Sequence, residues 1–203
     1  MSQVSGQLDF DLDRLWAKGI RARALGAPLV VDVLPLAAGA TRVSARGRLE
    51  VDRIQRQVPT LPLQIATGDA GFVIDVDVPG GARRGSNPVV LAVQSDLEGI
   101  AVDLPAPFGK QAGETRPLQV RLPLGGHPEP GAFAYSDLVK ARFSGDGARV
   151  DVALGGGEAE LQSDPGIRVS GHLGEVDLLA WNDALEPLAG ANTGVPAHLE
   201  LAL

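Results

Sequence analysis

The sequence predicts an all-β fold, with many short antiparallel strands and one or two short helices. Three observations predict it. Apolar and polar residues alternate in short runs along the chain, as in Phe72 to Val78. Turn residues interrupt these runs every 8–12 residues or so, in the manner of sandwiches and barrels. The 26 glycines and 15 prolines suit short strands joined by turns. The strands could form either a curled sheet with an open groove or a β-sandwich.

The first half of the chain contains strands, one hairpin and one short helix. Gly26, Ala27 and Pro28 predict a hairpin turn, and Pro59 and Pro62 end a helical stretch. In order, we expect strands at Gly6–Leu12, Ile20–Ala24, Leu29–Val33 and Thr41–Val51, a helix or irregular connection at Asp52–Val58, and strands at Leu63–Ile65 and Gly71–Pro79.

The second half follows the same design. The Gly145-Asp-Gly147 turn predicts a hairpin, and Asp177 predicts a helix N-cap. We expect strands at Val89–Val93, Ile100–Leu104, Leu118–Leu124, Tyr135–Phe143, Arg149–Leu154, Ala159–Leu161 and Ile167–Leu173, and a helix at Leu178–Leu188. Leu178, Trp181, Leu185 and Leu188 share one face of that helix, so Trp181 is expected to be a core residue.

The domain prediction is a single all-β segment over residues 1–203, with an optional sub-boundary near residues 80–88, where glycines and a proline cluster. Ala197 to Leu203 alternate like a strand that is cut off without a turn. We therefore expect a fragment of a longer protein. No apolar run approaches the roughly 18 residues that a spanning helix needs.

The composition argues against several classes of partner and chemistry. A net charge of −7 without a basic cluster disfavours nucleic acid and direct docking on anionic membranes. The chain has no cysteine, which excludes disulfides and thiolate ligands. The three histidines, His127, His172 and His198, form no zinc pattern. We expect neither a metal nor a cofactor.

Candidate catalytic and binding motifs are weak. Asp9, Asp11 and Asp13 have the spacing of calcium ligands but lack the glycine and glutamate of an EF-hand loop. Gly109-Lys110 lacks the rest of a phosphate-binding loop. Asp75 and Asp77 share one strand face, as do Arg42, Arg46 and Arg48. Both sets are typical of a solvated strand face, so we predict no enzymatic activity.

Three stretches resemble the YhdP-type members of the AsmA-like envelope proteins. The first runs from Ser95 to Lys110 (SDLEGIAVDLPAPFGK) and continues at Ala112-Gly-Glu. The second is Ile167 to Trp181, where Leu179 departs from the usual second acid of the family pattern. The third and weakest is Gly19 to Pro35. The pieces follow one another across nearly the whole chain.

The resemblance implies a middle segment of a large periplasmic protein anchored in the bacterial inner membrane by one N-terminal helix. Repeated β segments of this family curl into an apolar groove that is thought to shield acyl chains of phospholipids moving between inner and outer membranes. The implied partners are those acyl chains and neighbouring segments of the same parent chain, with membrane association only through the parent's anchor. The alternative is a non-enzymatic β-sandwich that serves as a structural or ligand-binding module.

A lipid groove requires one continuous aliphatic sheet face. The candidate groove residues on alternating strand positions are Ile74, Val76, Val78, Leu91, Val93, Ile100, Val102, Leu104, Val120 and Leu122. Pro105 and Pro107 then end strand pairing, which predicts a structural corner at Gly109-Lys110.

Overall fold

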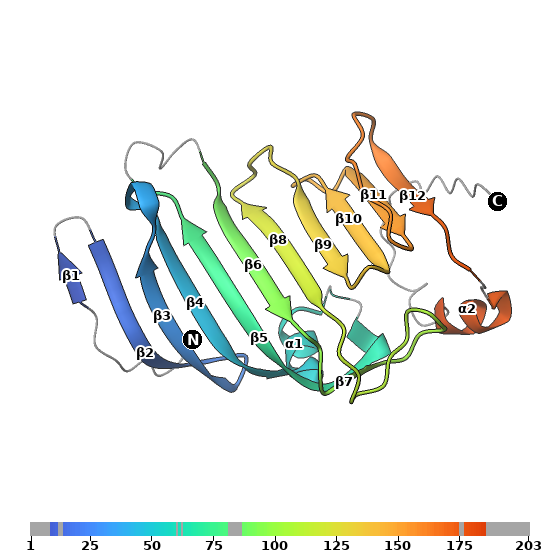
Figure 1. Cartoon of the computed structure of the whole chain (residues 1–203), viewed down its shortest axis with the longest axis horizontal. Helices are drawn as coiled ribbons and strands as arrows, with labels where there is room; N and C mark the ends of the chain where they lie inside the picture. The colour runs from blue at the N-terminus through green and yellow to red at the C-terminus, as the bar shows by residue number, and fades with distance from the viewer. Residues whose placement is uncertain are drawn as a thin grey trace.

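The computed structural model describes residues 9–11, 14–59, 61, 63–80, 87–174 and 177–185. These residues form one open, curled sheet with two short α-helices, which confirms the all-β prediction (Figure 1). The open sheet is the observed alternative, and the described residues form no second sheet packed against it as in a sandwich. Eleven strands follow one another in the order β1-β2-β3-β4-β5-β6-β8-β9-β10-β11-β12, and β7 pairs with β5 off this path.

The first half of the sheet is a meander of antiparallel strands. Its elements are β1 (Asp9–Asp11), β2 (Arg14–Ala24), β3 (Ala27–Pro35), the 3₁₀ turn Ala37–Gly39, β4 (Thr41–Glu50), α1 (Val51–Gln57), the 3₁₀ turn Leu63–Ile65 and β5 (Ala66–Val78). The β2–β3 hairpin and α1 confirm the predictions for these stretches. The predicted strand at Leu63–Ile65 is wrong: the Leu63 N–H donates to the Gln55 side chain at 3.0 Å instead of to a neighbouring strand.

The second half continues the sheet and ends in a helix. Its elements are β6 (Val89–Ser95), β7 (Ile100–Val102), β8 (Leu118–Leu124), β9 (Gly131–Tyr135), β10 (Val139–Phe143), β11 (Arg149–Leu154), β12 (Gly166–Gly171) and α2 (Leu178–Leu185). Asp177 caps α2 as predicted, since its carboxylate accepts the N–H groups of Leu179 and Ala180 at 3.0 and 3.1 Å. The Gly145-Asp-Gly147 turn joins β10 to antiparallel β11, also as predicted.

Three predictions for this half are wrong. The stretch Tyr135–Phe143 is not one strand, because a turn at residues 136–138 separates the end of β9 from β10. Ala159–Leu161 is not a strand, because the stretch Gly155–Pro165 is a long connection between β11 and β12. That connection carries the chain back, so β12 pairs with β11 in parallel rather than antiparallel.

Of the predicted strand Gly6–Leu12 the structure describes Asp9–Asp11 only. The predicted final strand Ala197–Leu203 and His198 lie outside the described residues.

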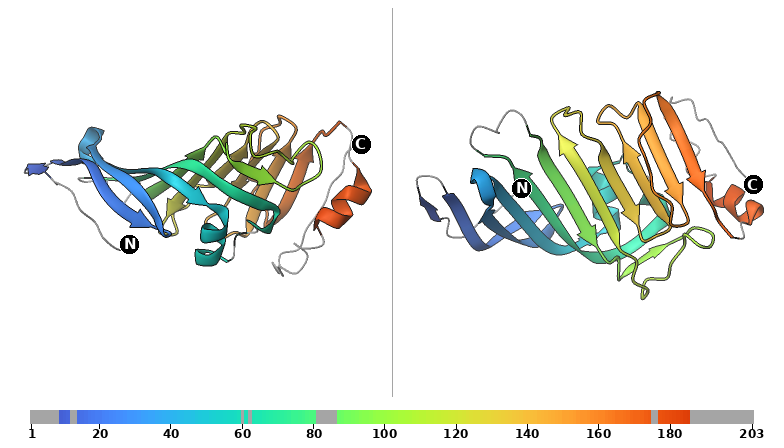
Figure 2. Two further views of the ribbon diagram at one scale, coloured as in Figure 1. Left: turned by 90° about the horizontal axis from the view of Figure 1, so that it is seen from below. Right: turned by 45° about the horizontal axis from the view of Figure 1, so that its top comes forward.

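The sheet is a single layer that twists along its length (Figure 2). Both helices lie on the same side of it in the view from below, and Trp181 of α2 packs edge-on against Phe108 with ring centroids 5.4 Å apart. Trp181 is half-buried there, at one end of the molecule. No helix among the described residues is long and apolar enough to cross a membrane.

Candidate apolar binding face

Strand alternation sorts the side chains of the sheet onto two faces of opposite character. One face is apolar, and because the register keeps equivalent positions opposite one another, its residues form rows that cross the strands. We call the row that crosses ten strands the long row: Ile20, Val31, Ala45, Ile74, Val93, Val120, Phe133, Ala141, Val152 and Val169. Nine strand spacings of about 4.8 Å give it a length of roughly 43 Å.

A second row runs beside the long row. Its members lie two residues away from those of the long row on β3, β4, β5, β6 and β8. This short row consists of Ala17, Val33, Val43, Val76, Leu91 and Leu122. Val43, Val76, Leu91 and Leu122 are only half-buried and belong to no buried cluster of the described residues. Leu124, beyond the row at the end of β8, is 43% exposed. The apolar face therefore stays open along this edge.

The opposite edge of the apolar face is closed. Val51 and Ile54 of α1, Leu63, and the connection from Asp96 to Pro117, which we call the capping segment, cover it. Leu97 and Ile100 of the capping segment are 5% and 4% exposed and pack into a cluster with Leu29, Leu49, Ala70, Phe72 and Tyr135. Covering these side chains stabilises the fold by about 25 cal/mol per Å² of apolar surface. The hydrophobic core thus lies at one edge of the sheet.

Two polar side chains hold the capping segment in place, one from within the segment and one from β9. The Lys110 side chain is buried, and its ammonium group donates to the main-chain carbonyls of Leu97 and Gln111 at 3.0 Å and to that of Ile100. The Tyr135 hydroxyl, from β9, donates to the Phe108 carbonyl at 2.9 Å. Gly109-Lys110 is therefore part of a structural corner. The burial of Lys110 was not expected from the sequence.

Seven of the ten candidate groove residues lie together on the apolar face. Ile74, Val93 and Val120 belong to the long row, Val76, Leu91 and Leu122 to the short row, and Val78 follows on β5. The other three, Ile100, Val102 and Leu104, lie outside both rows. β7 pairs with the first residues of β5, and its Val102 forms a bridge with Lys110. Ile100 is buried in the core, and Leu104 follows the end of the strand, which is shorter than predicted.

The sequence interpretation missed the contribution of the last four strands to the face. Phe133, Ala141, Val152 and Val169 extend the long row across β9 to β12. Apolar and polar residues alternate in these strands too, but their small residues made the alternation hard to recognise in the sequence. Gly131 faces Phe143, and a Cβ on the glycine would lie 2.2 Å from the phenylalanine ring. The ring therefore covers the glycine and keeps the face apolar there.

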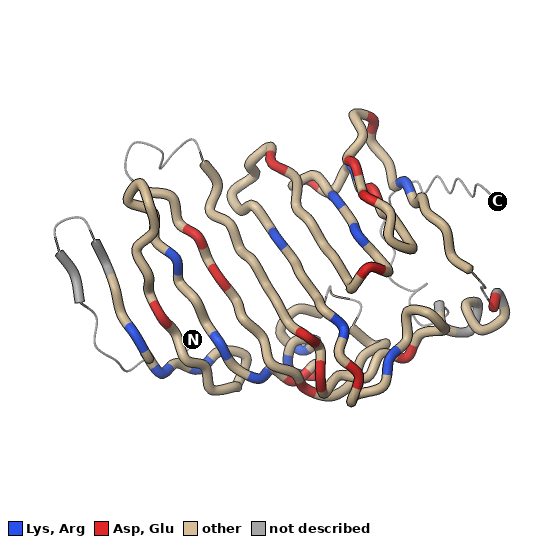
Figure 3. Tube along the Cα trace, in the orientation of Figure 1, with Lys and Arg blue, Asp and Glu red and all other residues tan. Residues whose placement is uncertain are grey.

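The other face carries charged side chains, which are paired across strands in the first half of the sheet. Figure 3 shows how the acidic and basic residues are distributed along these strands. Arg42 donates to both carboxylate oxygens of Asp77 at 2.6 and 2.7 Å and lies 3.9 Å from Asp75. Arg46 pairs with Asp32, and Arg48 with Asp69 at 2.7 Å. The predicted polar face is confirmed, but its charges bind one another as well as solvent. Asp75 and Asp77 serve as ion-pair partners there.

These pairs predict a loss of stability in acid. The hydrogen bonds from Arg42 lower the pKa of Asp77 below its ordinary value of 3.8. As the pH falls, Asp77 is therefore protonated at a higher pH in the unfolded chain than in the folded chain. The stabilisation is complete above pH 3.8 and disappears as the pH falls through the lowered pKa. We expect at most about 1 kcal/mol from this partly exposed pair. Urea unfolding between pH 6 and pH 2 measures it, and Asp77→Asn should flatten that part of the curve. If Asp77→Asn loses as much stability between pH 6 and pH 2 as the original chain does, Asp77 is not the source of this pH dependence.

No group of three or more His, Cys, Asp or Glu residues that could hold a metal ion occurs in the part of the chain that the structure describes. In the Gly125–Gly131 loop, the Nδ1 of His127 accepts the Glu129 N–H at 3.4 Å. The side chains of Asp9, Asp11 and Asp13 lie outside the described part.

A single open, curled sheet, with an apolar face on one side and charged residues on the other, defines an all-β protein of the open-sheet class. A family model described as YhdP protein matches residues 1–202. The chain therefore belongs to the YhdP family, a family of bacterial envelope proteins, and the resemblance stated from the sequence is confirmed. No curated protein and no solved structure matches the chain.

Proposed function

We propose that this chain shields lipid acyl chains on its apolar face, as a segment of a protein that moves phospholipids between the inner and outer membranes. The observation that carries the proposal is the pair of apolar rows, in which Val43, Val76, Leu91 and Leu122 of the short row are half-buried and belong to no buried cluster of the described residues. Proteins in water rarely expose a continuous apolar surface of this kind unless it binds something. Aliphatic side chains offer apolar area without imposing a shape on the ligand.

The arrangement of the face suggests how an acyl chain would lie. The capping segment and α1 close one edge of the apolar face, and the opposite edge ends at half-buried Val78 and Val89 and exposed Leu124. An acyl chain would therefore run across the strands along the short row, with its headgroup at the open edge. Val76, Leu91 and Leu122 would contact it, and Ile74, Val93 and Val120 would form the inner wall.

The proposal extends to the parent protein. We place the chain in the periplasm, as a middle segment of a protein anchored in the inner membrane, with neighbouring segments of that protein as its other partners. The rows cross the strands rather than run along them. A sheet extended by further strands would therefore lengthen the same path. No catalytic step is part of the proposal.

The test is to find where lipid contacts the protein. The chain is produced in the periplasm of a bacterium with a photoreactive benzoylphenylalanine in place of Leu91 or Leu122, irradiated, and analysed by mass spectrometry. We expect phospholipid adducts at both positions. The control places the same residue at Val30, which is 43% exposed and lies on the polar face of β3.

Equal labelling at Val30 and at the two groove positions would contradict the proposal. So would purified protein without extractable lipid and without adducts at Leu91 or Leu122. Either result would favour a structural module whose apolar face is covered by protein.

A further inference from the structure

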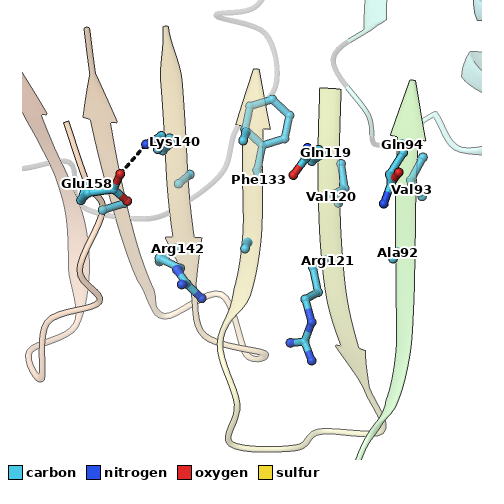
Figure 4. A pocket seen from close by; sticks show the side chains of 14 residues that line it. Ala92, Val93, Gln94, Gln119, Val120, Arg121, Phe133, Lys140, Arg142 and Glu158 are labelled. Atoms are coloured by element: carbon cyan, nitrogen blue, oxygen red, sulfur yellow. Dashed lines mark hydrogen bonds and ion pairs between the residues drawn. The ribbon is translucent and has the colours of Figure 1, made fainter. Parts of the chain in front are cut away.

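A hollow of about 310 Å³ lies on the polar face, across β6, β8, β9 and β10 (Figure 4). It exists because small residues occupy the polar-face positions in its centre: Ala92 on β6, and Ala132 and Ala134 on β9. The connection between β11 and β12 contributes Glu158 and Ala159 to its wall. The charged and amide side chains of the hollow lie on the opposite face of the sheet from the apolar rows, and Val93, Val120, Phe133 and Ala141 of the long row also contribute to its lining.

Two arginines flank the centre of this hollow. Arg121 on β8 and Arg142 on β10 are both register partners of Ala132, which lies between them on β9. Their backbones are therefore two strand spacings apart, or about 10 Å, a gap that two arginine side chains can span to reach one ligand. Figure 4 shows the two side chains on either side of β9.

In the first half of the sheet, cationic and anionic side chains on the polar face are paired. In the hollow, the cations outnumber the anions. Arg142 makes no ion pair with any residue that the structure describes, although buried Asp151 is its register partner on β11. Arg121 lies 3.7 Å from Glu129, which is outside the lining, and its charge also acts on Asp77. Lys140 is bonded to Glu158, the one acid in the lining. Three cations against one anion leave the hollow with a charge of +2 in a chain whose net charge is −7.

Neutral donors complete the site. Gln94 and Gln119 are register partners on β6 and β8, and both side chains line the hollow beside the arginines. Guanidinium groups present planar pairs of N–H donors that match the oxygens of a phosphate, and the glutamine amides can donate to the remaining oxygens. The lining thus has the chemistry of a site for a tetrahedral oxyanion.

We propose that this hollow binds a phosphate group, with Arg121 and Arg142 as its principal ligands. Inorganic phosphate and the phosphodiester of a lipid headgroup share this chemistry. The proposal does not depend on acyl-chain binding, because its residues lie on the other face of the sheet. Affinity should fall as the salt concentration rises, since the contacts are charged and partly exposed.

The experiment is an NMR titration of the full chain with inorganic phosphate, followed through the arginine side-chain N–H signals. We expect saturable shifts at Arg121 and Arg142. Arg142→Gln should weaken binding about tenfold, the effect of losing one charge-assisted contact. Glu158→Gln should strengthen binding severalfold, because it removes the acid and frees Lys140. The control is Arg21→Gln, which removes a charge from the polar face of β2, outside the hollow.

A second titration uses glycerophosphoglycerol, a soluble phosphodiester, to distinguish the sources. Binding of both probes supports a headgroup ligand, and binding of inorganic phosphate alone supports a free phosphate ligand. No saturable shift with either probe, or equal weakening by Arg142→Gln and Arg21→Gln, overturns the proposal. Lipid adducts at Leu91 and Leu122 should persist in Arg142→Gln, so the two proposals fail or stand separately.

Discussion

Replacing Lys110 by methionine should lower the free energy of unfolding by about 3 kcal/mol. The side chain is 4% exposed, and its ammonium group is bonded to three main-chain carbonyls of the capping segment. Methionine has a similar volume but no donor, so three buried acceptors lose their partner, at about 1–3 kcal/mol each. Part of this loss is offset, because the variant no longer buries a charge.

The measurement is urea unfolding at pH 7, with Lys18→Met as the matched control. Lys18 is exposed on β2, and its replacement should change the stability by less than about 0.5 kcal/mol. A loss in Lys110→Met no larger than in the control would show that the three hydrogen bonds do not hold the capping segment.

The pH dependence of stability gives a second readout for Lys110. Burial lowers the pKa of its ammonium group below the ordinary value of 10.5. The unfolded chain then holds the proton more tightly than the folded chain does. The stability contributed by this group therefore rises as the pH increases from the lowered pKa towards 10.5. This rise should be missing in Lys110→Met, whereas Lys18→Met should retain it.

The strands themselves could be predicted because their signals are local. In Phe72 to Val78 the alternation of apolar and acidic residues determines which side chains share a face, whatever the neighbouring strands are. The Gly145-Asp-Gly147 turn brings its own flanking strands together. These features need no information from distant parts of the chain.

The pairing of distant segments could not be predicted in the same way. Ile100 alternates like a groove residue, but it belongs to the core because β7 joins the start of β5. That contact needs two glycines: a Cβ on Gly68 would lie 2.2 Å from the Gly99 carbonyl oxygen, and a Cβ on Gly99 2.2 Å from that of Asp69. Alternation assigns a face to a side chain, but it does not say whether that face is covered.

The same limit applies to the charged residues. Arg42, Arg46 and Arg48 were correctly placed on one polar face, but their aspartate partners come from β3 and β5. The anion-binding hollow depends on a coincidence of register, in which two arginines face one alanine on the strand between them. Such a site appears only when the order and register of the strands are known.

Placing a carboxylate in the short row should abolish most lipid binding. Val76 lies on β5 between Val43 and Leu91, in the half-buried part of the apolar face. In Val76→Asp the new carboxylate can be hydrated while the face is free. A bound acyl chain would strip that water away without supplying a hydrogen bond, which costs several kcal/mol. We expect at least a tenfold or so loss of bound lipid, the effect of a difference of about 1.4 kcal/mol.

The control for this variant is Val73→Asp on the same strand. Val73 is also a half-buried valine, but it lies on the polar face, with Arg46 and Gln94 as its register partners. Phospholipid per mole of purified protein, measured by extraction and mass spectrometry, should fall in Val76→Asp and stay unchanged in Val73→Asp. Circular dichroism melting shows whether both variants are folded. If folded Val76→Asp retains as much lipid as Val73→Asp, the short row does not carry acyl chains, because only a ligand on the apolar face distinguishes the two carboxylates.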